Sequence, residues 1–256
     1  MTQNFAGNAS EFEEFASAQA NEFFQQRVHV LEYLTLPQII SGNPYLLKFS
    51  GHRLFDASCL IEMWLDTTLL ANDTLLFDKF LENTAIFLFT HLFQWRKLSQ
   101  MEHAMALETP KNLQVAYVIA RVNSVTLLST RDSIEALRIQ ARQLEKTSKK
   151  PVQSIFGICW GPDETVNLQD IRIISGRSFW SLIANGAKLF DEILVTFSSS
   201  TLKHSEIYEY KKAATLNKLT REFIERFCNA DGAIDWLRLV EFNSGNHDLH
   251  EFIWLT

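Results

Sequence analysis

The sequence contains few of the residues that usually make linkers and sharp turns. Only five prolines and nine glycines occur among its 256 residues. No stretch rich in proline and serine, low-complexity tract or internal repeat interrupts it. A chain of this length with 46% apolar residues can bury a sizeable core. We therefore expect one large domain, or a main domain with a helical extension.

Cysteine is scarce as well, and long apolar runs are absent. Cys59, Cys159 and Cys228 lie far apart, each in an apolar context. Such an odd, scattered set fits buried thiols in a reducing compartment better than disulfides or a zinc site. No apolar run approaches the roughly 18 residues of a membrane span, and residues 1–10 lack the apolar core of a signal peptide. These absences predict a soluble cytoplasmic protein without a membrane partner.

Positive charge is in deficit, and the common motifs of nucleotide-binding proteins and hydrolases are missing. The 24 basic and 30 acidic residues give a net charge of −6. This charge argues against non-specific binding to nucleic acids or anionic membranes, but it leaves room for a local basic cleft. The sequence has no glycine-rich phosphate loop, dinucleotide fingerprint, His-Glu-x-x-His motif or Gly-x-Ser-x-Gly elbow. Any catalytic or binding site in this sequence must therefore consist of a different arrangement of residues.

The most informative stretch is a predicted β-hairpin. Residues 104–107 and 113–122 are two apolar runs, and the second is rich in β-branched and aromatic residues. Between them stands Thr-Pro-Lys-Asn at 109–112, a composition that favours a chain reversal. Helical patterns flank the hairpin at 73–95 and 131–146. Helix, hairpin, helix and strand in this order predict a mixed α/β core.

Helical and strand patterns cover most of the remaining sequence. We expect helices over residues 10–31, 55–70, 178–183, 188–195 and 205–240, and strands over 152–160 and 170–174. The helix at 73–95, capped by residues 72–74, is the most apolar, and Phe80 and Leu88 should be buried on it. Glu82 is a polar exception on this helix. It is either a helix-edge glutamate that reaches solvent or a functional carboxylate.

Several segments, in this order and spacing, resemble type II restriction endonucleases of the PD-(D/E)XK superfamily, especially the branch that cuts interrupted GG-N-CC sites. The entry segment Asn-Pro-Tyr-Leu at 43–46 resembles the same branch. The segments of the core are FDKFLENTAI at 77–86, WRKLS at 95–99, YVI at 117–119, GICWG at 157–161, GRSFWSLI at 176–183 and LFDEI at 189–193. The resemblance covers residues 43 to 195.

The resemblance implies a restriction-endonuclease-like core, an α/β fold with a mixed β-sheet flanked by helices. It also implies helical N- and C-terminal extensions, homodimeric binding to double-stranded DNA and Mg²⁺-dependent phosphodiester hydrolysis. The expected division is 1–42 for an N-terminal extension, 43–200 for the core and 201–256 for a C-terminal helical region. The catalytic chemistry needs one carboxylate on the first hairpin strand, and a carboxylate and a lysine two residues apart on the second. The acids hold the metal, which polarises the phosphate and activates water.

Carried onto this sequence, the catalytic pattern is incomplete. The first acid falls on Ala104 or Met105, and the Glu-x-Lys positions fall on Arg121 and Asn123. An arginine at 121 would repel Mg²⁺. Only Glu82 matches the glutamate that the resemblance places on the helix. The other acids near the first strand, which could supply a displaced ligand, are Glu102 and Glu108.

Three hypotheses follow from this pattern. The first is a restriction-endonuclease-like DNA-binding protein with a decayed nuclease site. The second is an active restriction enzyme of a restriction-modification system, with Mg²⁺ held by migrated ligands. The third is a non-enzymatic scaffold or partner-binding protein. Under the first two, the best DNA-binding surface is the basic helix face that carries Arg131, Arg138, Arg142 and Lys146, with Lys149 and Lys150 beyond its end; its alternative interpretation is a solvated helix face.

Overall fold

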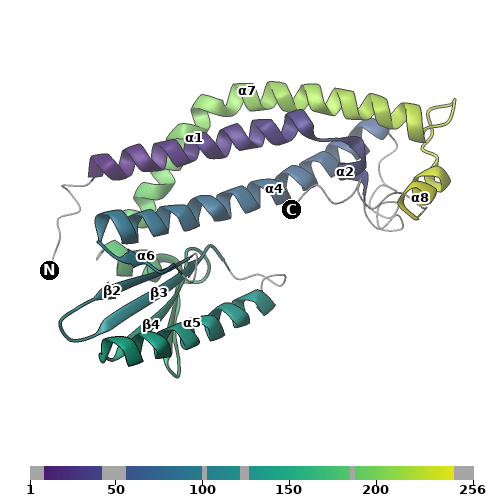
Figure 1. Ribbon diagram of the computed structural model, residues 1–256. Coiled ribbons are helices and arrows are strands. Elements are labelled where there is room, and N and C mark those ends of the chain that lie inside the picture. The colour runs from purple at the N-terminus through teal and green to yellow at the C-terminus, as the bar shows by residue number, and fades with distance from the viewer. Residues whose placement is uncertain (1–8, 42–55, 100–102, 122–126, 185–187, 245–256) are drawn as a thin grey trace. The chain divides into compact units, whose positions relative to one another are not determined.

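The computed structural model describes residues 9–41, 56–99, 103–121, 127–184 and 188–244 (Figure 1). The chain forms two compact units. The first consists of Met1–Phe23 and Leu76–Leu202, and the second of Phe24–Leu75 and Lys203–Thr256. The division expected at residues 42/43 and 200/201 stays a prediction. In the described ranges, no helix has the length and apolar character needed to span a membrane.

The first unit is built on a six-stranded mixed sheet with the order β1-β2-β3-β4-β6-β5. β1, β2 and β3 are antiparallel neighbours, β3, β4 and β6 run parallel, and β5 pairs antiparallel with β6 at the edge. The strands are β1 (Arg96–Lys97), β2 (Ala104–Glu108), β3 (Leu113–Ile119), β4 (Val152–Ile158), β5 (Thr165–Leu168) and β6 (Ile171–Ser175). The predicted α/β core with a mixed sheet is therefore present.

The predicted hairpin is β2 and β3, and its turn lies where the sequence placed it. Ala104 pairs with Tyr117 and Glu108 with Leu113. Within the turn, the backbone N–H of Thr109 donates to the carbonyl oxygen of Asn112 at 2.9 Å. The Thr109 hydroxyl also donates to that carbonyl oxygen, at 2.8 Å. These local bonds close the reversal and fix the register of the two strands.

Helices cover both faces of this sheet. Helix α5 (Leu127–Ser148) packs on β3 and β4, where Leu137 is fully buried with Val115 and Phe156. Helix α6 (Gly176–Ala184) lies on the opposite side of the strands (Figure 1). Gly157 on β4 allows this packing, because a Cβ atom there would collide with the ring of Phe179 on α6. The largest buried cluster of the unit lies on the α6 side and includes Phe80 and Leu88, which confirms their predicted burial.

The helices predicted at 55–70 and 73–95 are in fact one helix, α4 (Ala57–Phe87), which continues into a π-helical turn at Leu88–Leu92. The expected cap at residues 72–74 was wrong for a local reason. The Asn72 amide donates to the carbonyl of Thr68 at 3.3 Å, and the Thr74 hydroxyl donates to that of Leu70 at 2.7 Å. Both side chains thus bond back to the preceding turn, as they can within a helix, and do not end it.

In the C-terminal half, too, two helices that we expected to be separate form one helix. The helices expected at 188–195 and 205–240 are joined in α7 (Lys188–Phe227). This helix ends at Phe227 and does not reach residue 240, because the chain turns at Gly232, whose φ is 82°, before α8 (Trp236–Ser244) begins. Strands β1 and β5 were missed, because β1 has two residues and all four residues of β5 are exposed. Neither strand shows the apolar alternation that marks a half-buried strand.

The second unit is helical in its described part. It contains the later part of α1 (Ala9–Tyr33), α2 (Leu36–Ile40), the first part of α4, the later part of α7, and α8. Thr35 and Gln38 form a capping box that starts α2 after the end of α1. Arg27 binds Asp73 through two hydrogen bonds of 2.7 Å, and its guanidinium lies 3.9 Å from the centroid of the Tyr208 ring. These contacts join three helices of the unit around one buried cluster.

Candidate functional site

Two carboxylates of α4, Asp78 and Glu82, face the strands of the hairpin region. They are four residues apart, so they lie one above the other on the same face of the helix. Leu81 and Ala85 beside them are buried in the core, which fixes the helix against the sheet. Both carboxylates are only partly shielded, since the side chain of Asp78 is 17% exposed and that of Glu82 is 23% exposed. Each is therefore near enough to the surface to meet a ligand.

Glu82 contacts the ends of both hairpin strands. Its Oε1 accepts a hydrogen bond from the backbone N–H of Ala120, just after β3, at 2.8 Å. Its Oε2 lies 3.9 Å from Nδ1 of His103, the residue before β2. That nitrogen is buried and has no hydrogen-bond partner among the described residues. His103 is held at this point because the Val118 N–H donates to its carbonyl oxygen, which extends the β2–β3 ladder by one residue.

The carboxylate of Asp78 accepts hydrogen bonds from two side chains at the ends of sheet strands. Nε of Arg121 donates to its Oδ2 at 2.8 Å, and the indole N–H of Trp160 donates to its Oδ1 at 3.2 Å. The guanidinium of Arg121 also lies 5.6 Å from the centroid of the Trp160 ring, within the range of a cation–π contact. Asp78, Arg121 and Trp160 thus form one cluster at the carboxyl ends of β3 and β4.

The residues at the catalytic positions implied by the resemblance lie in different surroundings. Met105 is fully buried in the cluster on the α6 side of the sheet, and Ala104 is fully buried in the cluster on the α5 side. Arg121 makes the ion pair with Asp78 just described. Asn123 lies outside the described residues, as does Glu102.

Glu108 is not brought to this site. It stands at the far end of β2, four residues from Ala104, which corresponds to about 13 Å along a strand. Its carboxylate is paired with Nζ of Lys150 at 2.7 Å, and this hydrogen bond lowers the pKa of Glu108. Of the three proposed migrated ligands, Glu82 alone is placed at the hairpin ends among the described residues.

Sequence reasoning missed Asp78, His103 and Trp160. One signal was available for Asp78, because its spacing of four residues from Glu82 places both on one helix face. His103 and Trp160 had no such signal, since each enters through contacts with residues far away in the sequence. In the described ranges, no group of three or more His, Cys, Asp and Glu side chains is arranged to hold a metal ion. The site as built is a set of internally paired charges.

The basic face of α5 is only partly available for a ligand. Arg131, Arg142 and Lys146 are exposed. Arg138, by contrast, donates to Asp170 at 3.0 Å and to Glu135 at 3.3 Å, and these hydrogen bonds raise its pKa further. Two carboxylates thus offset the charge of Arg138. The other three residues form no ion pair among the described residues, although the nearby charge of Arg142 contributes to the lowered pKa of Asp170.

Comparison with known proteins identifies the relevant family. The family model described as type II restriction endonuclease EcoO109I matches residues 10–205, well over half of the chain. A search of curated proteins finds no match. The family match confirms the resemblance inferred from the sequence segments, and the mixed sheet flanked by helices is a restriction-endonuclease-like fold.

Proposed function

The chain belongs to the type II restriction endonuclease EcoO109I family, and from this premise we propose that it binds double-stranded DNA without cleaving it. Membership of the family makes it a restriction-endonuclease-like, DNA-acting protein. The proposal is narrower: the fold serves DNA binding, and the Mg²⁺ site that such a nuclease requires has decayed. The proposal includes a homodimer, which rests on the family resemblance, and a cytoplasmic location, which rests on the scarce and scattered cysteines.

One observation carries the proposal, namely the position of Arg121. Its guanidinium binds Asp78 at 2.8 Å beside the end of β3, where a metal-binding carboxylate is expected. Mg²⁺ needs oxygen ligands in near-octahedral geometry, usually with one or two carboxylates and several waters. A fixed positive charge at this point repels the ion and also neutralises one of the α4 carboxylates. The described residues at the ends of the hairpin strands therefore do not fit Mg²⁺.

The direct test is duplex binding measured in parallel with cleavage. We expect mobility shifts at low salt with mixed-sequence duplexes or with duplexes that carry an interrupted GG-N-CC site. The DNA should remain intact with and without Mg²⁺. The binding should weaken steeply as salt rises, because phosphate contacts release counterions. Mg²⁺-dependent cutting of either duplex would contradict the proposal. Absence of binding to both would favour the partner-binding scaffold.

A second candidate, an active nuclease with migrated ligands, is favoured by one feature. In the part of the chain that the structure describes, the Nδ1 atom of His103 is buried without a hydrogen-bond partner, 3.9 Å from Oε2 of Glu82. Imidazole nitrogen and carboxylate oxygen are both metal ligands, although imidazole suits transition metals and not Mg²⁺. Two ligands fall short of a complete site. This candidate therefore ranks second, and metal titration separates it from the first.

For the wild-type protein we expect no stoichiometric Mg²⁺ or Mn²⁺ site in a calorimetric titration. The variant His103→Asp/Arg121→Glu should gain one, because it removes the arginine and adds two carboxylates near Glu82 and Asp78. It should be less stable without metal, since the carboxylates repel one another. Mg²⁺ should then raise its Tm, by about 2–4 °C for each kcal/mol of binding free energy.

The matched control is His103→Asn/Arg121→Gln, which removes the same side chains but adds no charge. It should show no response to Mg²⁺.

Position 103 is preferable to 105 for the new acid, because Met105 is fully buried and a carboxylate there would disrupt the core. A stoichiometric site in the wild type that is lost on Glu82→Gln would establish the migrated-ligand candidate instead.

A further inference from the structure

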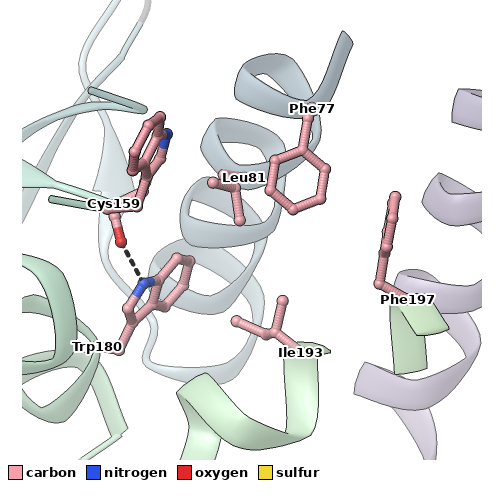
Figure 2. A pocket seen from close by; sticks show the side chains of 7 residues that line it. Phe77, Leu81, Cys159, Trp180, Ile193 and Phe197 are labelled. Atoms are coloured by element: carbon pink, nitrogen blue, oxygen red, sulfur yellow. Dashed lines mark hydrogen bonds between the residues drawn. The ribbon is translucent and has the colours of Figure 1, made fainter. Parts of the chain in front are cut away.

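An apolar pocket of about 180 Å³ lies in the first unit, beside the Asp78 cluster. Figure 2 shows Leu81 and Ile193 pointing toward one space, with Trp180 on one side and Phe197 on the other. The walls come from α4, the end of β4, α6 and α7. The lining residues are Phe77, Leu81, Cys159, Trp160, Trp180, Ile193 and Phe197.

The polar groups of the lining residues form hydrogen bonds outside the pocket or are neutral. The indole N–H of Trp180 donates to the carbonyl oxygen of Cys159 at 2.6 Å (Figure 2), and that of Trp160 donates to Asp78. Burial, followed by the nearby charges of Glu82 and Asp78, raises the pKa of the Cys159 thiol well above its ordinary value. The thiol is therefore neutral at physiological pH and behaves as a small apolar group. Only apolar atoms face the pocket.

The size and lining of the pocket define the class of ligand. An apolar cavity of about 150 Å³ stays dry and accepts benzene, so a pocket of about 180 Å³ has room for a molecule of similar or slightly larger size. Four of the seven lining residues are aromatic, which favours edge-to-face or offset contacts with another ring. A nucleobase or an ionised group would lose its hydration without gaining a partner here. We propose that this pocket binds a neutral, apolar aromatic molecule of one or two rings.

Trp160 connects this pocket with the Asp78 cluster. Its ring lines the pocket, its N–H donates to Asp78, and the same ring lies beside the guanidinium of Arg121. Trp160 is 41% exposed, so the pocket wall that it forms is near solvent. A ligand that moves this indole also changes its contacts with Asp78 and Arg121.

The test is a titration of the full-length protein with indole, followed by NMR of ¹⁵N-labelled tryptophan side chains. A ligand of this size in an apolar site should show a dissociation constant on the order of 0.1–1 mM. We expect saturable shifts of the Trp160 and Trp180 indole N–H signals, with no change at Trp64 or Trp95. Fluorobenzene should act in the same way. Benzoate and adenine should not, because the lining offers no partner for a carboxylate or for the several ring nitrogens and amino group of adenine, whereas indole loses the hydration of a single N–H.

Two variants that fill the pocket provide an independent measurement. Leu81→Phe and Ile193→Phe each place a ring in the space and should weaken indole binding at least tenfold. Leu168→Phe is the matched control, because Leu168 is exposed on β5 and the same substitution there should leave binding unchanged. Absence of saturable shifts in the wild type would overturn the proposal, as would equal shifts at all four tryptophans. Binding of adenine as tight as that of indole would exclude the apolar ligand class.

Discussion

Reversal of two charges on α5, Arg142→Glu with Lys146→Glu, should weaken duplex binding about 100-fold at low salt. The two side chains are exposed and four residues apart, so they share one face of the helix. If each contacts a phosphate, the slope of log affinity against log salt should become shallower by about two. Mobility-shift titrations over a range of salt concentrations measure both quantities.

The control for this variant carries the same change in charge at another place. Lys218→Glu with Arg221→Glu alters two exposed residues of α7 and lowers the net charge by the same amount. It should bind DNA nearly as the wild type does. Equal losses in the two variants would mean that net charge and not the α5 face governs binding. Arg138 is left unchanged, because its ion pair with Asp170 holds α5 to the β5–β6 turn.

Replacement of Leu88 by alanine should lower the free energy of unfolding by about 2–5 kcal/mol. Leu88 is fully buried at the start of the π-helical turn, in the cluster between α4 and the sheet. The loss combines the transfer free energy of the removed atoms with the cavity that they leave. Urea unfolding followed by tryptophan fluorescence would measure it, and amide hydrogen exchange of β3 would assign it to the first unit.

Leu75→Ala is the matched control for this substitution. Leu75 lies on the same helix, but 62% of its surface is exposed. Its replacement should change stability by no more than about 0.5 kcal/mol. If Leu88→Ala were as mild as Leu75→Ala, α4 would not be the central support of the sheet, and the position of Asp78 and Glu82 would need another explanation.

The sequence predicted one residue of the candidate site but not the arrangement of the site. Glu82 was identified because it interrupts an apolar helix, and such an exception is visible locally. Glu108 was a candidate for a displaced ligand, yet it pairs with Lys150 at the far end of β2. Sequence patterns alone do not show which carboxylate reaches the ends of the hairpin strands, since this depends on how α4 crosses the sheet.

The structural role of Arg121 likewise could not be predicted from the sequence alone. The sequence placed an arginine where a metal ligand was expected. Its partners are Asp78, 43 residues earlier, and Trp160, 39 residues later. No local pattern encodes contacts at such separations, because they arise when the ends of β3 and β4 meet one face of α4. The inference that the charge is paired internally therefore required the structure.

By itself the sequence determined the β2–β3 hairpin, the helix that follows it and the buried residues of α4. Turn chemistry and apolar periodicity act over a few residues, so they can be recognised without the fold. Only the tertiary structure decided that Asn72 and Thr74 continue α4, that His103 meets Glu82, and that Trp160 joins the apolar pocket to the Asp78 cluster. These features depend on side chains finding partners across packed elements, and packing is a property of the whole folded unit.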